Sequence, residues 1–317
     1  MSANAHSVVE ATPLSRRLAG AVVILYALIS LVPLVWIVLT SLKTPPDSIA
    51  YPPKWVFEPS LEGYVNVFTN RSRQAPEYMQ TLPPATSWYD ELVRSRNMVI
   101  TGPSRFLERY ANSLIIGFGS TFLAVFLGTL AAYGFSRFRI PGIRYIFFLL
   151  IATIMIPSNI TLVPTYFLFS RNGLDWIGTW LPLIVPHFFG NAILIFLLRQ
   201  NFKSIPRDLD EAAMLDGAGP LRILISVILP QSTPVVTTVA LLHFFYVWNE
   251  TRLTSLYLGI APDLQTISFG IQRTQTLFFT PDALMVGALV AMIVPVIVLL
   301  FSQRFFMQDM IVTQIEK

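Results

Sequence analysis

The sequence lacks cysteine altogether and has little charge, and each absence restricts what the chain can be. Without cysteine there are no disulfides and no thiolate metal ligands. Asp, Glu, Lys and Arg make up 13% of the 317 residues, about half of the ~25% that is usual in a soluble domain. The three histidines, His6, His187 and His243, form no HExxH zinc motif. We therefore expect no metal site, and the low charge points away from a soluble fold.

Catalytic and nucleotide-binding motifs are missing as well. The chain has no GxSxG nucleophile motif, and it has no GxxxxGK[ST] phosphate loop. We expect a protein that is not an enzyme, has no catalytic residues and binds no cofactor. His187 and His243 fall in apolar stretches, where packed and hydrogen-bonded side chains are expected.

Six long stretches contain no Asp, Glu, Lys or Arg, and 54% of all residues are hydrophobic. Each stretch reaches the ~20 residues that a helix needs to cross a bilayer, and only helices satisfy their own backbone groups in lipid. The sequence predicts an all-α integral membrane protein with six transmembrane helices. The stretches are residues 18–42, 110–136, 145–170, 176–198, 223–249 and 283–303.

Lys and Arg are unevenly distributed among the segments that connect these stretches, and cytoplasmic loops carry the excess. The enriched set is Arg16 and Arg17; Arg137, Arg139 and Arg144; Arg199, Lys203, Arg207 and Arg222; and Arg304 and Lys317. Both termini are therefore expected in the cytosol. The formal charge of +4 lies largely in these loops, so topology explains it and no nucleic-acid partner is needed.

These boundaries divide the chain into five parts. We expect a cytosolic tail (1–17), a first transmembrane helix (18–42), an extracytoplasmic segment (43–109) with a partly ordered excursion (70–105), a five-helix core (110–306) and a second cytosolic tail (307–317). A short helix is expected in the excursion near Trp88–Arg96. A loop this long is usually functional or disordered, and the sequence leaves that open.

The cytosolic loop 199–229 contains a short Ala-rich segment with acids near both of its ends. Asp208 and Glu211 have the spacing of a capping box, and Gly217 or Gly219 can end a helix in the left-handed conformation. Pro220 can open a second helix, and Leu229-Pro230 marks a kink before the fifth span. The loop therefore predicts two short helices at the membrane surface.

Two interpretations of this loop remain open. In one it is a capped connector, whose Glu211 and Asp216 occupy cap and solvent positions. In the other it docks on a soluble partner, since Ala212 and Ala213 permit close approach and the two acids fix the register by charge-assisted hydrogen bonds.

Several separated motifs resemble one family, the permease subunits of binding-protein-dependent ABC importers. Glu211-Ala-Ala-x-x-x-Gly217, followed by Val227-x-Leu229-Pro230, resembles that family's EAA loop, which usually has Ile in place of Val227. The run 205–218 is similar to the carbohydrate (maltose-type) branch. Further matching segments are Asn112-Ser-Leu-Ile, Leu130-Ala-Ala-Tyr-Gly-Phe-Ser-Arg137, Phe245-Tyr-Val-Trp-Asn-Glu250, Leu264-Gln-Thr266 and Gln303-Arg-Phe-Phe306. The excursion 70–105 and the tail after Phe306 depart from the family pattern.

The resemblance implies a type I importer permease fold in a prokaryotic inner membrane, active in the import of a sugar, oligosaccharide or polyol. It implies a second permease subunit as heterodimer partner, two ATP-binding subunits that carry ATP and Mg, and an extracytoplasmic solute-binding protein. Segment 208–219 would be the coupling helix in a groove of an ATPase subunit. The coupling residues would be Glu211, Ala212, Ala213, Asp216, Gly217, Ala218 and Gly219.

Candidate substrate contacts are polar or aromatic residues in spans or at their ends: Asn112, Asn191, Trp248 and Asn249. Trp at a span end is more often an interfacial anchor. The external loop that the family directs toward the binding protein corresponds to residues 250–275. The candidate contacts within it are Gly259, Ile260, Ala261, Pro262 and Asp263.

Two other classes compete with an importer. An ion-coupled secondary transporter usually carries ionisable residues at mid-membrane, and none of the six stretches has one. A non-transporting membrane scaffold would leave the cytosolic loop without a role.

Overall fold

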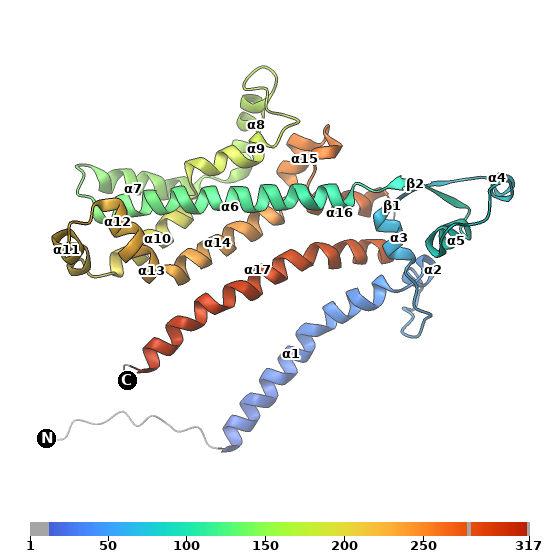
Figure 1. Cartoon of the computed structure of the whole chain (residues 1–317), viewed down its shortest axis with the longest axis horizontal. Coiled ribbons are helices and arrows are strands. Elements are labelled where there is room, and N and C mark those ends of the chain that lie inside the picture. The colour runs from blue at the N-terminus through green and yellow to red at the C-terminus, as the bar shows by residue number, and fades with distance from the viewer. Residues whose placement is uncertain (1–12, 278–279, 316–317) are drawn as a thin grey trace. The chain divides into compact units, whose positions relative to one another are not determined.

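The computed structural model describes residues 13–277 and 280–315 of the chain, and it describes side chains for residues 14–273 and 280–305. The described chain divides into two compact units. The first contains residues 13–102 and 280–289, and the second contains residues 103–277 and 290–315. Nearly all regular structure is helical, as the sequence predicts (Figure 1).

The first unit contains a long apolar helix and a small mixed subdomain. Its elements are α1 (Pro13–Ser41), α2 (Pro45–Ser48), α3 (Glu62–Phe68), β1 (Thr69–Arg73), α4 (Pro76–Gln80), α5 (Trp88–Arg94), β2 (Met98–Pro103) and the start of α17 (Pro281–Ile315). Helix α1 matches the first expected span, and its most apolar window has no buried residue. Ion pairing between Arg96 and Glu62 (3.3 Å) and a hydrogen bond from Ser48 to Asp282 (3.2 Å) join separated segments of this unit.

The excursion 70–105 has more structure than the sequence indicates. The expected short helix is confirmed as α5, where Ser87 caps the Asp90 N–H and Arg94 pairs with Asp90 at 2.8 Å. Strands β1 and β2 pair in a two-stranded sheet that was not predicted. The residues of β1 (Thr-Asn-Arg-Ser-Arg) are all polar, so they carry no alternating apolar pattern that would reveal a strand.

The second unit is a helix bundle arranged around α6 (Phe106–Arg137). The other elements are α7 (Ile143–Ala152), η1 (Thr153–Met155), α8 (Ser158–Phe169), α9 (Leu181–Ile184), η2 (Val185–Phe189), α10 (Ala192–Ser204), α11 (Asp208–Leu215), α12 (Pro220–Ile223), η3 (Leu224–Ile228), α13 (Leu229–Gln231), α14 (Thr233–Trp248), α15 (Arg252–Leu258), η4 (Pro262–Leu264), α16 (Ile267–Leu277) and most of α17. Helices α10 and α14 pack along α6.

Small residues on α6 allow this close packing. Ala124 and Ala132 are fully buried against Leu198 and neighbouring side chains. A Cβ atom added at Gly117 would lie only 3.2 Å from the ring of Phe244, so α14 approaches α6 there more closely than a larger side chain permits. Small residues are typical of helix–helix contacts in membranes.

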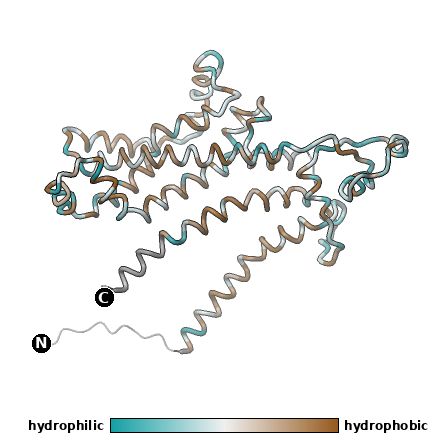
Figure 2. The backbone as a smooth tube through the Cα atoms, in the orientation of Figure 1, coloured by the Kyte–Doolittle hydropathy of each residue, from teal (hydrophilic) through white to brown (hydrophobic). Residues whose placement is uncertain are grey.

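Within the described ranges, four helices are long and apolar enough to cross a membrane: Leu14–Ser41, Phe106–Arg137, Leu181–Ser204 and Pro281–Phe305. Two further helix pairs pass the same test together but are sharply bent, Ile143–Met155 with Ser158–Phe169 by 97° and Pro220–Gln231 with Thr233–Trp248 by 84°. The spans number four, or six if each bent pair crosses once. Apolar residues dominate these helices and polar ones the loops (Figure 2).

Prolines lie at both bends. Pro157 immediately precedes α8, and Pro234 lies in the first turn of α14. Proline removes a helical hydrogen bond and clashes with the preceding turn, which accounts for breaks at these points. Pro33, Pro164 and Pro295 lie inside helices that continue through them.

Candidate functional site

The loop between α10 and α14 folds as two short helices joined at Gly217, as the sequence predicts. Gly217 has a left-handed backbone (φ +81°). Its N–H donates to the Met214 carbonyl (3.0 Å), and the N–H of Ala218 donates to the Ala213 carbonyl (2.9 Å). These two bonds form a Schellman motif, which ends α11 and satisfies its last carbonyls. Pro220 then opens α12.

The predicted capping box at the start of α11 is wrong. Asp208 is the first helical residue, Arg207 precedes it as the cap, and the cap has no side-chain hydrogen bond. The first turn instead directs Asp210 into the protein, where it is buried. Asp208, Asp210 and Glu211 still place three acids near the positive end of the helix dipole.

The predicted coupling residues divide into an exposed set and a half-buried set. Glu211, Ala212, Asp216, Gly217 and Gly219 are exposed. Ala213 and Ala218 are half-buried and pack against the core of the bundle. Among the described residues, neither Glu211 nor Asp216 has an ion-pair or side-chain hydrogen-bond partner that would make it a structural cap.

Exposed apolar side chains lie beside these acids. Leu215 is 90% exposed and Met214 is 58% exposed. After the loop, Leu229 is half-buried against the core, and Pro230 is exposed just before the 84° bend. The predicted kink residues thus lie inside α13, and the break follows Gln231. The outer surface of α11 combines carboxylates with apolar groups that the described part of the chain leaves uncovered.

Side chains of the loop and the end of α6 hold each other tightly, and we call this set of contacts the α6 clamp. Arg137, in the last turn of α6, forms an ion pair with Asp210 (Nε–Oδ2 2.9 Å), and both side chains are at least nine-tenths buried. The same guanidinium donates to the Ile205 carbonyl (3.1 Å). The hydroxyl of Tyr133 donates to the Pro220 carbonyl (3.0 Å).

Two further arginines cap the carboxyl end of α6. Arg207 donates to the Ser136 carbonyl (3.3 Å), and Arg199 donates to the Phe135 carbonyl (3.2 Å). The last carbonyls of a helix lack intrahelical partners and lie at its negative end, so cations are favoured there. The α6 clamp therefore ties α11 and α12 to the longest helix of the second unit. In the sequence, the positions of Arg199 and Arg207 indicate the membrane topology and not this capping role.

Three of the four candidate path residues serve local structure. Asn112 is buried and donates to the carbonyls of Asp263 (2.7 Å) and Gln265 (3.0 Å). Asn191 caps α10 by accepting from the Ile193 N–H (2.9 Å). Trp248 is buried and stacks on Phe244, with 5.4 Å between ring centroids.

The fourth candidate, Asn249, is exposed and donates to the Phe245 carbonyl (2.8 Å). The two intramembrane histidines behave as expected: His243 Nε2 lies 3.1 Å from His187 Nδ1, and His243 Nδ1 lies 3.2 Å from the Thr121 hydroxyl.

The external loop Gly259–Asp263 follows α15, and contacts from Arg105 and Asn112 hold its last residue. Asp263 pairs with Arg105, and Asn112 binds its carbonyl. Ile260 is 78% exposed. Within the part of the chain that the structure describes, no group of three or more His, Asp or Glu side chains could hold a metal ion.

Comparison with known proteins gives a family. The sequence profile described as "Binding-protein-dependent transport system inner membrane component" matches residues 124–312. The sulfoquinovosyl glycerol transport permease SmoH of Agrobacterium fabrum is 31% identical over 278 residues, which cover 86% of this chain and 85% of that one. The osmoprotective compounds uptake permease GgtD of Synechocystis is 30% identical over 230 residues (70% and 72%).

The fold has a counterpart among solved structures. A chain of a bacterial ABC transporter involved in the import of the acidic polysaccharide alginate superposes with a TM-score of 0.68, at 19% identity, and the match covers 96% of this chain and 100% of that one. The chain therefore belongs to the family of inner-membrane components of binding-protein-dependent transport systems, and it is a multi-pass permease subunit of the inner membrane.

Proposed function

We propose that this permease works in an ATP-driven importer for a sugar, oligosaccharide or polyol. It would pair with a second permease subunit as a heterodimer, with two ATP-binding subunits that hold ATP and Mg, and with an extracytoplasmic solute-binding protein. Each bent helix pair would cross the membrane once, which gives six spans and places both termini in the cytosol. Family membership sets aside the ion-coupled and scaffold alternatives.

The cargo class rests on the relatives. Their names refer to osmoprotective compounds, to sulfoquinovosyl glycerol and, for the permease SugB of Mycobacterium tuberculosis (32% identical over 203 residues), to trehalose. The last two are carbohydrates, so the same class is proposed here.

The exposed surface of α11 is the observation that supports the coupling role. Glu211, Ala212 and Asp216 lie beside the uncovered Met214 and Leu215, while Ala213 and Ala218 face the bundle. An ATPase groove that covers the apolar groups and pairs with the acids would complete this surface. Closure of two ATPase subunits would then move α11, and the α6 clamp would transmit that movement to the spans.

Glu211→Lys and Gly217→Asp test the coupling role. The first reverses a charge on the exposed surface, and the second distorts the left-handed turn. We expect both variants to insert into the membrane normally but to lose ATP-driven uptake in proteoliposomes. Glu77→Lys, a charge reversal at another exposed acid, on α4, is the matched control and should transport normally. Uptake at the unmodified rate in both loop variants would reject the coupling role of α11.

A further inference from the structure

A cavity in the second unit has no assigned role. It lies between α8 and α15, toward the end of α6 opposite the clamp, and has a volume of about 260 Å³. We propose that this α8–α15 pocket binds one uncharged sugar ring or small polyol within this chain. The proposal rests on the proposed function for the cargo class, and it adds a binding site on this subunit with a stated charge and size.

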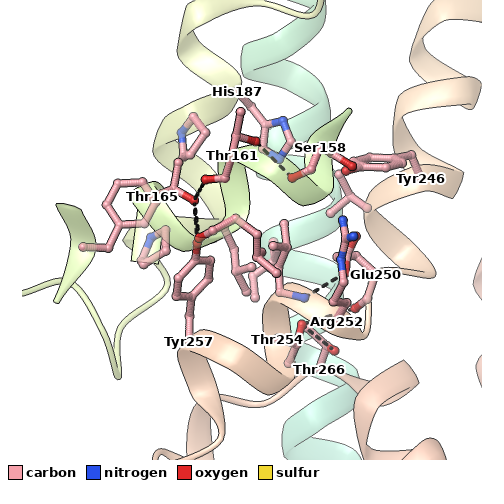
Figure 3. A pocket seen from close by; sticks show the side chains of 18 residues that line it. Ser158, Thr161, Thr165, His187, Tyr246, Glu250, Arg252, Thr254, Tyr257 and Thr266 are labelled. Carbon is pink, nitrogen blue, oxygen red and sulfur yellow. Dashed lines mark hydrogen bonds between the residues drawn. The ribbon is translucent and has the colours of Figure 1, made fainter. Parts of the chain in front are cut away.

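One wall of the pocket is a row of hydroxyl groups. Ser158, Thr161 and Thr165 lie on α8 at spacings of three and four residues, which place them on the same face of the helix. Figure 3 shows all three hydroxyls near the cavity. Thr161 and Thr165 donate to carbonyls of their own helix (3.0 Å and 2.8 Å), and their oxygens remain able to accept from a ligand.

The opposite wall provides the donors and the acceptor that a polyol needs. Glu250 accepts from the Leu253 N–H through Oε1 (2.9 Å), and its second oxygen has no partner in the described structure. Arg252 donates to Asn159 through one nitrogen (2.5 Å), while a guanidinium has five N–H groups. Charged groups form the stronger hydrogen bonds to hydroxyls. The two walls therefore face each other with complementary chemistry (Figure 3).

Two contacts bridge the walls and set the width of the cavity. The hydroxyl of Tyr257 lies 3.3 Å from that of Thr165, and Arg252 contacts Asn159. Tyr257 is itself buried, stacked on Tyr166 and edge-on to Phe169. Drug-sized ligands occupy sites of roughly 300–1,000 Å³, so a cavity of about 260 Å³ limits the occupant to a single ring or a short polyol.

The remaining lining excludes charged and fully apolar occupants. Apolar side chains form the back of the cavity, among them Ile116, Leu183 and Val247, and they suit the C–H faces of a sugar ring. Glu250 and Arg252 are its one acid and its one permanently charged base, so their charges cancel. An ionic cargo would bring a net charge without a counter-charge, whereas a neutral polyol satisfies both groups.

The test uses the complete transporter, with its partner subunits, in lipid nanodiscs. Binding of glucose, glycerol and sorbitol is measured by saturation-transfer NMR, with glycerol 3-phosphate as the charged probe. We expect at least one neutral probe to bind. Thr161→Val and Glu250→Gln keep the shape of their side chains and should each weaken that binding about tenfold. Thr238→Val, outside the cavity lining on α14, is the matched control and should bind normally.

Three results would overturn the proposal that the α8–α15 pocket binds a neutral sugar or polyol. They are unchanged binding in both variants, binding of glycerol 3-phosphate alone, and no binding of any probe. Loss of assembly in both variants would show that a partner subunit fills the cavity, and it would equally reject a ligand site. The importer proposal has its own test. It fails if the unmodified complex shows no ATP-dependent uptake, whatever the pocket variants bind.

Discussion

Arg137 and Asp210 form the buried ion pair at the centre of the α6 clamp. Their side chains are 6% and 9% exposed and 2.9 Å apart. Removing one partner of a buried ion pair leaves the other charge uncompensated, at a cost of about 3–5 kcal/mol, whereas an apolar replacement of both is often neutral.

Because the single and double replacements differ in cost, they distinguish the effect of the ion pair on stability from its effect on coupling. Arg137→Met should lower the thermal unfolding temperature of the complex, and the double variant Arg137→Met/Asp210→Leu should restore most of it. Both variants should transport poorly per ATP hydrolysed, because α11 is no longer tied to α6. Unfolding is followed by tryptophan fluorescence, and the uptake-to-hydrolysis ratio is measured in proteoliposomes. A double variant with the normal ratio would show that the ion pair serves stability alone.

At the scale of elements, the sequence predicts what is local and misses what is distant. The helices of the long apolar stretches, the helix at Trp88 and the turn at Gly217 depend on neighbouring residues, and they are present. The capping box fails because Asp208 is already inside α11 and Arg207, which makes no side-chain cap bond, precedes it. Asp210 instead pairs with Arg137, far earlier in the chain. No local sequence pattern predicts this ion pair or the pairing of β1 with β2.

The same distinction applies to the candidate site. Exposure of Glu211 and Asp216 follows from an amphipathic loop helix, and the sequence finds these residues. Asn112 and Trp248 resemble cargo-binding groups by residue type, yet the fold uses them for contacts with η4 and Phe244. The hydroxyl row of α8 was missed because Ser and Thr are common in apolar helices and only the arrangement of α8 and α15 brings them into one cavity.

The turn between α15 and η4 is the element proposed to contact the binding protein. Ile260 is its most exposed large apolar side chain, at 78%, while Asp263 is held at the base by Arg105 and Asn112. Ile260→Glu should therefore leave the fold intact and weaken docking of the loaded binding protein about tenfold. Stimulation of ATP hydrolysis by that protein is the measurement, and Leu174→Glu, on another exposed turn, is the control. Equal stimulation in both variants would remove this turn from the interface.

At the scale of the whole molecule, the proposed six-span topology places the loop at α11 and the excursion on opposite sides of the membrane. The chain has no cysteine, so a maleimide reacts in this chain with the single introduced thiol alone. Asp208→Cys should react with a membrane-impermeant maleimide only after cells are permeabilised, and Glu77→Cys should react in intact cells. Labelling of both positions from the same side would contradict the six-span topology.

The proposed importer is a two-state machine, in which ATPase closure must bind one arrangement of the spans better than the other. Chemical cross-linking at α11 tests its central claim most directly. Leu215→Cys should form a cross-link with a cysteine placed in the groove of the ATPase subunit, with a yield that changes when ATP is added. Tyr145→Cys, at another well-exposed position, on α7, should not react. Absence of any ATPase cross-link from Leu215→Cys in an assembled, transport-competent complex would contradict the account.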